Sequence, residues 1–298
     1  HSGHGHGGVG FSPTTMIMGK TAFVIGGIAT NEGTATTNNP HQNEAVSFSY
    51  DTKLMAHTSF TGKDVLKTVV RVGNFTKDDP FGMMGAARLE TAFNGDASDT
   101  LKLHRSYYQF PFSENWTATI GAELRQDDML GVWPSAYPSD AVLDVLTYAG
   151  AKDAYPKTMG AGAGVTWADN NLSASLLFVS ENAAESSSQE ATAGGILTSH
   201  GSDDVTGQIA WLGDGITLAA AYTIADNGNQ GGAVDADDYS AFGLSGVYEV
   251  ENLGINSEWL PTSISAGMGW KTPDKEDNPD TSANGVEDTT TWSVGLIW

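Results

Sequence analysis

Hydrophobic and polar residues alternate clearly from Val46 to Phe60. A period of two places successive side chains on opposite faces of a β-strand, so one face is apolar and the other mostly polar. An ordinary globular strand has about 5–6 residues, whereas a strand that crosses a bilayer needs roughly 9–11, with its polar side toward a water-filled interior. The pattern therefore predicts a membrane-spanning strand. Its apolar face contains Val46, Phe48, Tyr50, Leu54, Ala56 and Phe60, and its polar face contains Ser47, Ser49, Asp51, Lys53, His57 and Ser59.

A second strand follows after the tight turn at residues 61–64, whose sequence is Thr-Gly-Lys-Asp. Thr68, Val70 and Val72 share one face of this strand, while Lys67 and Arg71 share the other. The two strands and their turn, within residues 45–74, predict a hairpin with one face toward lipid and one toward water.

The same alternation recurs along the rest of the chain and predicts twelve strands. A thirteenth candidate strand at residues 88–93, together with one further strand as its partner, would raise the number of strands to fourteen. We therefore expect an all-β fold, a transmembrane antiparallel up-and-down β-barrel of about 14 strands, with a range of 12–16. The twelve clear strands lie near residues 14–27, 46–60, 65–74, 101–110, 116–125, 161–167, 172–178, 205–211, 216–222, 242–248, 264–270 and 292–298.

Short turns and long polar loops alternate between these strands, as in membrane barrels. Large aromatic residues lie at the strand ends, where interfacial girdles are expected. The longest break, residues 126–157, is acidic and contains an apolar patch at 142–146. A loop of this length is usually functional, and we expect it to fold into the barrel as a constriction loop. We therefore expect the chain to consist of a flexible His/Gly-rich segment at residues 1–13 and a transmembrane β-barrel at residues 14–298.

Composition narrows the class of protein further. No apolar run of about 18 residues is present, so we expect neither a transmembrane helix nor a signal peptide in this numbering. Cysteine is absent, which excludes disulfides and thiolate metal sites. The formal net charge of −22 argues against nucleic acid as a partner, because phosphate binding needs a basic surface.

The inward faces carry the candidate pore residues. A Lys or Arg on the lipid face at mid-membrane costs about 2–4 kcal/mol, so the strand cations are expected in the lumen. Acidic residues of the 126–157 loop would face this basic strip across a narrow zone with a transverse field. The alternative is that these charges pair or are solvated within the lumen. The predicted pore-lining residues are Lys53, Lys67, Arg71, Arg105, Glu123 and Arg125, and the predicted constriction-loop residues are Asp127, Asp128, Asp140 and Asp144.

Three stretches resemble the cyanobacterial outer-membrane porins, which are related to carbohydrate-selective porins and include proteins described as iron-uptake porins. The stretches are 58–74, 107–111 (Tyr-Tyr-Gln-Phe-Pro) and 160–164 (Gly-Ala-Gly-Ala-Gly). The resemblance implies an outer-membrane homotrimer, in contact with lipid and lipopolysaccharide, that passes inorganic ions and small hydrophilic solutes. The peptidoglycan-anchoring region of that family is missing here, and Gln109 stands where an arginine is expected.

Two other classes of function remain open at this point. A plugged structural barrel, serving as an envelope anchor or receptor, is the main alternative to a porin. An outer-membrane hydrolase ranks lower, because His57 has no nucleophile signature near it. We expect no enzyme activity, no cofactor and no metal site, since the acidic stretch 274–280 lacks the spacing of an EF-hand and the histidines within 1–13 fit a linker. The preference for cations or anions stays open, because the net charge and the basic strip point in opposite directions.

Overall fold

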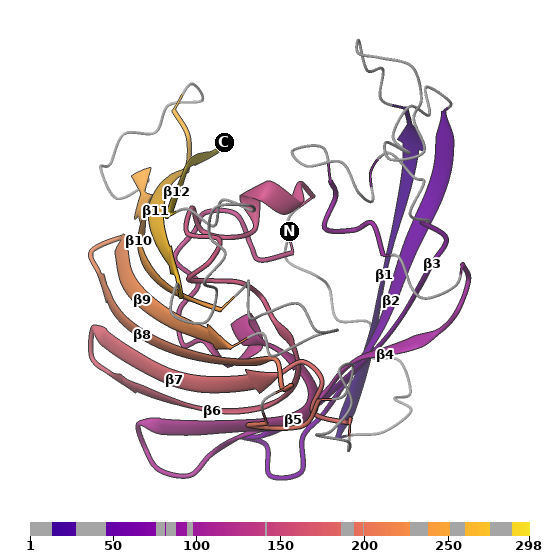
Figure 1. Ribbon diagram of the computed structural model, residues 1–298, viewed down its shortest axis with the longest axis horizontal. Helices are drawn as coiled ribbons and strands as arrows, with labels where there is room; N and C mark the ends of the chain where they lie inside the picture. The colour runs from indigo at the N-terminus through magenta and orange to yellow at the C-terminus, as the bar shows by residue number, and fades with distance from the viewer. Residues whose placement is uncertain are drawn as a thin grey trace.

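The computed structural model describes residues 14–27, 46–75, 81, 88–93, 98–140, 142–185, 194–198, 200–226, 238–250, 260–274 and 288–298. These residues form one curved antiparallel sheet that wraps around a central segment (Figure 1). No helix in the described part of the chain is long and apolar enough to span a membrane. The strands are β1 (Thr15–Gly26), β2 (Ser47–Thr58), β3 (Val65–Gly73), β4 (Lys102–Pro111), β5 (Trp116–Arg125), β6 (Met159–Asp169), β7 (Leu172–Ser180), β8 (Asp203–Gly213), β9 (Ile216–Asp226), β10 (Tyr239–Glu249), β11 (Ser263–Pro273) and β12 (Thr289–Ile297).

Each strand pairs with the next one in the sequence, from β1 through to β12. This order confirms the all-β, antiparallel up-and-down class, with a number of described strands at the lower end of the expected range. β1 and β12 are the two edges of the sheet, and the described residues of these strands do not pair with each other. Short turns join β2 to β3, β4 to β5, β6 to β7 and β8 to β9 at one end of the sheet, where β10 also ends and β11 begins.

Residues 88–93 do not form the strand that the sequence suggested. Leu89 makes a single isolated bridge to Leu143, and the backbone around it turns. Arg71 donates to the carbonyl oxygen of Glu90 (3.0 Å), which ties this segment to the concave face of the sheet. The alternation at 88–93 therefore reflects a short segment packed inside the sheet, not an additional strand in the wall.

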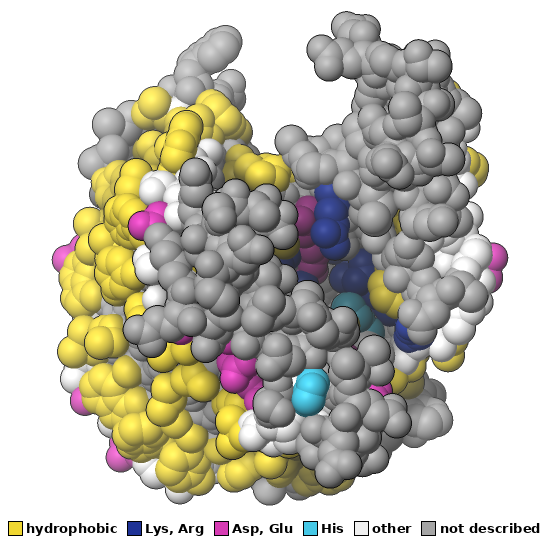
Figure 2. Space-filling view, in the orientation of Figure 1, with side chains coloured by type: hydrophobic (Ala, Val, Ile, Leu, Met, Phe, Trp, Pro, Cys, Tyr) yellow, Lys and Arg dark blue, Asp and Glu magenta, His cyan; other side chains and the backbone are white. Residues whose placement is uncertain are grey.

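The two faces of the sheet differ as the period-two pattern predicts. Large apolar side chains point outward and are well exposed on most strands, and Figure 2 shows them covering the outer wall beside β8–β12. Polar and charged side chains line the concave face. Outward examples are Phe23, Phe48, Leu54, Ile120, Leu176, Ile209, Leu218, Leu244, Met268 and Val294; inward examples are Asp51, Arg71, Arg105, Ser175, Gln208, Thr223 and Ser245.

The predicted turn between β2 and β3 is held by one carboxylate. Asp64 Oδ1 accepts hydrogen bonds from the backbone N–H groups of Phe60 and Thr61 and from the hydroxyls of Ser59 and Thr61. Its Oδ2 accepts from the Tyr108 hydroxyl on β4 (2.6 Å). These bonds hold the pKa of Asp64 well below its ordinary value. The turn is thereby fixed to the neighbouring strand.

A β-bulge in β5 reverses one expected orientation. The pairing of β5 with β6 shifts register between Gly121 and Leu124, and an extra residue in a strand changes the face of the residues beyond it. Because Glu123 and Arg125 were predicted to face inward, strict alternation would place Leu124 on the lipid face, but it is fully buried with Met129 and Leu177. Glu123 stands opposite Ser106 within this irregular region.

Candidate functional site

The connection between β5 and β6, residues 126–157, lies against the concave face of the sheet. It contains two short 3₁₀ turns, Gln126–Met129 and Asp144–Leu146. Figure 1 shows this segment in magenta in the interior, on the side of β6–β12. The main hydrogen bonds to the wall join Gly131 to Ser175 (2.8 Å), Gln208 to Val132 (3.0 Å), Ser245 to Ala149 (2.7 Å), Thr291 to Gly150 (3.1 Å) and Tyr137 to Leu296 (2.9 Å).

Small residues allow this connection to approach the wall closely. Ala149, Ala151 and Ala154 form a buried cluster with Tyr155, and they meet glycines of β10 and β11. A Cβ added at Gly267 would collide with the carbonyl oxygen of Ala149, and one added at Gly269 would lie 2.7 Å from the Cα of Ala151. The side of the interior next to β6–β12 is therefore tightly packed, and the polar hollow lies toward β1–β5.

Three linked groups of charges line this hollow. In the first, Arg71 of β3 donates two hydrogen bonds to Asp51 of β2, at 2.8 and 2.6 Å. Both side chains are almost completely buried, and Phe93 packs against the guanidinium at 4.7 Å. His104 lies 3.3 Å from Arg71. A bidentate pair of this kind fixes the position of the arginine.

The second group centres on Glu90. Its carboxylate accepts from Arg125 (2.6 Å) and from Lys157 (3.0 Å). Arg125 also donates to Asp127 (2.5 Å), and Lys157 lies 3.7 Å from Asp144. Burial acts to raise the pKa of Glu90, but the charges of Arg125 and Lys157 outweigh it and hold that pKa at about 2. Burial, together with a hydrogen bond to Glu90, raises the pKa of Asp144.

The third group joins the loop to β3 and β4. Asp128 accepts from Arg105 (2.5 Å) and Tyr107 (3.2 Å) and lies 3.4 Å from Lys67. A bulge in β4 turns both Arg105 and its neighbour His104 inward. The carboxylate therefore joins the start of the loop to the wall.

Two cavities adjoin these charges. One, of about 390 Å³, is lined by Arg71, Arg88, Glu90, His104, Arg125 and Lys157. The other, of about 400 Å³, is lined by Lys152 and by residues of β12. Both are bordered by Asp144 and Tyr148. Figure 2 shows Lys and Arg side chains gathered inside the hollow. The first cavity provides a polar, charge-lined space between β1–β5 and the loop, and the second lies between the loop and β12.

The structure brings most of the predicted site residues together. Lys67, Arg105, Arg125, Asp127 and Asp128 contact one another directly, so the acidic residues are not held across an open zone from the basic strip. A transverse field of separated charges was expected; the geometry instead matches the alternative of pairing within the lumen, because buried charges need partners. Arg71 joins this network through Glu90, and Asp144 joins it through Lys157.

The remaining predicted residues lie at the edges of the network. Lys53 points inward from β2 between Lys20 and Arg71. Asp140 lies 3.7 Å from Lys20 and is half-exposed. Glu123 is half-buried and has no hydrogen bond or ion pair among the described residues. The stretch 274–280 lies outside the described residues except for Asp274, and so do the histidines within 1–13.

Sequence reasoning missed several members of the network. Asp51 was placed on the polar face without a role, and Glu90 and Lys157 were not selected. Glu90 lies in a segment that was interpreted as a strand, and Lys157 lies at the end of the loop. A possible signal was the need of each inward cation for a carboxylate, but the pattern alone does not identify which one.

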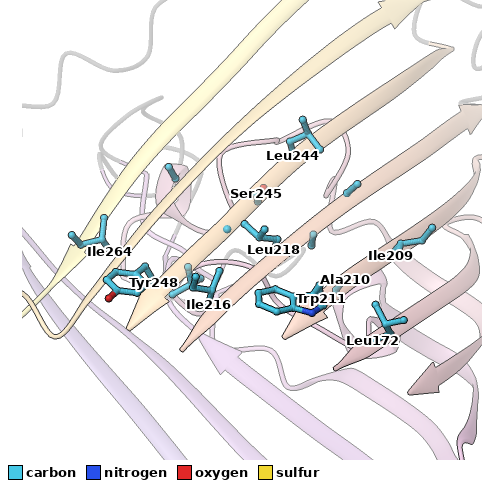
Figure 3. Close-up of a pocket in the computed structure, with 15 residues that line it drawn as sticks. Leu172, Ile209, Ala210, Trp211, Ile216, Leu218, Leu244, Ser245, Tyr248 and Ile264 are labelled. Carbon is cyan, nitrogen blue, oxygen red and sulfur yellow. The ribbon is translucent and has the colours of Figure 1, made fainter. Parts of the chain in front are cut away.

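A groove of about 880 Å³ lies on the outer wall, over β8–β11 (Figure 3). Ile209, Trp211, Leu218, Leu244 and Ile264 border it, and its lining is almost entirely apolar. Such a surface cannot orient a hydrophilic solute, so it is not the candidate site.

Comparisons with known proteins give partial similarities. No family model matches the chain. An uncharacterized protein of Synechocystis, sll0772, is 25% identical over 160 residues, which is 53% of this chain and 28% of the relative's length. Pseudomonas putida OprB superimposes with a TM-score of 0.49 at 11% identity, over 88% of this chain and 66% of OprB. A variant of the Rh. blastica porin gives a TM-score of 0.43 at 13% identity, over 96% of this chain and 80% of the porin.

Proposed function

We propose that the chain forms an outer-membrane channel for the passive diffusion of inorganic ions and small hydrophilic solutes. The observation that carries this proposal is the opposite chemistry of the two faces of each strand. In β2, Leu54 points outward with 49% of its surface exposed, whereas its neighbour Lys53 points into the hollow. An outward apolar band with a polar interior is the arrangement that a membrane pore requires.

The 126–157 loop acts in this proposal as the constriction. It fills the interior beside β6–β12 and leaves the charge-lined space beside β1–β5 for the solute. Lys53, Lys67, Arg71, Arg105, Arg125 and Glu123 serve as wall residues, and Asp127, Asp128, Asp140 and Asp144 as loop residues. The ion pairs of Lys67, Arg71, Arg105 and Arg125 fix the shape of the passage, because most of these pairs hold two elements together.

The lipid-facing surface supports the rest of the proposal. Its partners are lipid and lipopolysaccharide of a Gram-negative outer membrane, and the assembly is a homotrimer. The resemblance of residues 58–74 to cyanobacterial porins and the partial identity to a Synechocystis protein support a cyanobacterial origin. The molecular mass of the purified protein in detergent measures the oligomeric state.

Single cysteines test the channel directly, because the chain contains none. In planar bilayers, a membrane-impermeant cationic thiol reagent is expected to change the current through Lys53→Cys. The matched variant Leu54→Cys, one residue away on the opposite face, is expected to be unaffected. Reaction at Leu54→Cys that alters the current, together with no effect at Lys53→Cys, would show that the two faces are assigned the wrong way round.

A plugged barrel that serves as an anchor or receptor is the second candidate. The tight packing of Ala149 and Ala151 against the wall favours it, since a loop held in this way does not swing aside easily. The discriminating measurement is the conductance of the purified protein: steady single channels support the porin, and their absence at high protein concentration supports the plugged barrel.

A further inference from the structure

Three cationic residues stand side by side on the inward face of β1–β3. Lys20 is paired in register with Lys53, and Lys53 is paired in register with Arg71. We call these three residues the cationic row. Like charges directly opposite each other on neighbouring strands are destabilising. A row of this kind therefore needs compensating negative charge.

In the described part of the chain, carboxylates form ion pairs with the two ends of the row but not with its centre. Arg71 is neutralised by the bidentate bond with Asp51. Lys20 is 3.7 Å from Asp140, with about half of its side chain exposed. Lys53, which lies between them and is partly exposed, has no carboxylate within ion-pair distance among the described residues.

The nearby carboxylates of the network are already engaged. Asp127 and Asp128 are bound by Arg125 and Arg105. Glu90 is bound by Arg125 and Lys157. Moving one of these acids to Lys53 would leave another buried cation unpaired, which is costly. Among the described residues, no carboxylate is therefore free to pair with Lys53.

We infer that the cationic row is a transient binding site for small oxyanions, such as inorganic phosphate or a small carboxylate, between Lys53 and Lys20. Each ammonium group offers up to three hydrogen-bond donors on a flexible stem, which suits the oxygens of such an anion. This inference rests on the proposed function and adds a selectivity to it: the channel favours anions.

The overall charge of −22 does not contradict this selectivity. Charges separated by more than about 8 Å of salt solution are largely screened at physiological ionic strength. An ion beside Lys53 therefore responds mainly to the row and much less to charges farther away. The local excess of positive charge decides which ion is stabilised at this position.

The first test is the reversal potential in a potassium chloride gradient, with and without inorganic phosphate. Wild-type protein is expected to prefer anions, and phosphate is expected to reduce the chloride current in a saturable way. Lys53→Gln is expected to lower the anion-to-cation permeability ratio about sevenfold, because one unit charge about 7 Å away in water changes the stability of an anion and of a cation about threefold each, in opposite directions. Lys53→Gln is also expected to abolish the phosphate effect.

Lys63→Gln is the matched control, because it removes the same charge from the exposed turn between β2 and β3. It is expected to keep both the permeability ratio and the phosphate effect. Channels that conduct without anion preference, or a Lys53→Gln variant that behaves like wild type, would overturn the inference while leaving the proposed channel intact.

A second readout does not depend on conduction. At constant ionic strength, phosphate is expected to raise the unfolding temperature of the detergent-solubilised wild-type protein, because it relieves repulsion within the row. Lys53→Gln is expected to lose this response. If the protein does not conduct but phosphate still stabilises it through Lys53, the anion site is supported and the proposed channel function is contradicted. If the protein neither conducts nor is stabilised by phosphate, both proposals are contradicted.

Discussion

Arg71 and Asp51 form the most deeply buried ion pair of the described network, with 6% and 2% of their side chains exposed. Breaking a buried pair by removing one partner costs about 3–5 kcal/mol, because the other charge is left without compensation. Removing either Arg71 or Asp51 alone is therefore expected to destabilise the protein, whatever the net contribution of the intact pair to folding.

Asp51→Asn is expected to lower the unfolding temperature in detergent, because the Arg71 guanidinium then lacks a counter-charge. The double variant Asp51→Asn/Arg71→Met removes the orphaned charge and is expected to recover part of the loss. Thermal unfolding followed by circular dichroism measures both. A double variant less stable than the single one would indicate that packing of the arginine, not its charge, is the main contribution.

Glu90 makes the network sensitive to acid. Its pKa is held at about 2, below the ordinary value of about 4.3 for glutamate. A depressed pKa contributes stability that is present above the unfolded value and is lost as the pH falls through the folded one. Stability is therefore expected to fall between about pH 4 and pH 2. Glu90→Gln should weaken this dependence, as judged from unfolding temperatures across that range.

The pKa of Asp144 is shifted in the opposite direction, above its ordinary value. Because burial raises its pKa, it takes up a proton at a higher pH than an ordinary aspartate does. Its loss of charge leaves Lys157 and Arg88 less compensated in the first cavity, which both residues line. Anion preference in the bilayer is therefore expected to increase on acidification, starting at a higher pH than the titration of an ordinary aspartate would give, and Asp144→Asn should remove this change.

At the scale of elements, the 126–157 loop is held by close contacts between small residues. Gly267 faces the carbonyl oxygen of Ala149 so closely that a side chain cannot be accommodated. Gly267→Val should displace the loop from β11, at a cost of about 1–3 kcal/mol typical of overpacking. Conductance is expected to change, and a protease should cut within 126–157 faster than in the wild type.

Gly207→Ala provides the control for this variant. No atom lies within 4 Å of a Cβ built at Gly207, so this substitution should leave conductance and proteolysis unchanged. Equal protease sensitivity of wild type and Gly267→Val would indicate that the loop does not depend on this contact.

Elements defined by local pattern were predictable, and those defined by distant contacts were not. The β2–β3 hairpin and its turn were correct because alternation and turn residues act over a few positions. Leu124 was assigned to the wrong face because a bulge depends on how β5 pairs with β4 and β6. The segment at 88–93 was wrongly predicted to be a strand, because six alternating residues also fit a short segment that packs against the concave face of the sheet.

At the scale of the whole molecule, the outward apolar surface defines the environment of the protein. Ile209 lies in the middle of β8 with 66% of its surface exposed. Ile209→Arg is expected to cost about 2–4 kcal/mol on insertion into a bilayer, and thus to reduce the folded yield in lipid vesicles. Met55→Arg, on the inward face of β2, should insert normally; equal loss in both variants would contradict a lipid-facing surface.

The sequence alone determined the class of fold, most strand positions, the two faces of each strand and the inward placement of the strand cations. These follow from period two and from the high cost of a charge in hydrocarbon, which act on each strand separately. The sequence also indicated that the 126–157 loop was unusual in its length, its acidic residues and its apolar patch.

Only the tertiary structure decided which charges meet. Arg125 binds Glu90, Lys67 approaches Asp128, and Lys53 is left between two cations. These partners lie far apart in the chain, and strand register, bulges and the path of the loop bring them together. A one-residue change in any of these moves a side chain to the other face, so the local pattern cannot specify the pairs.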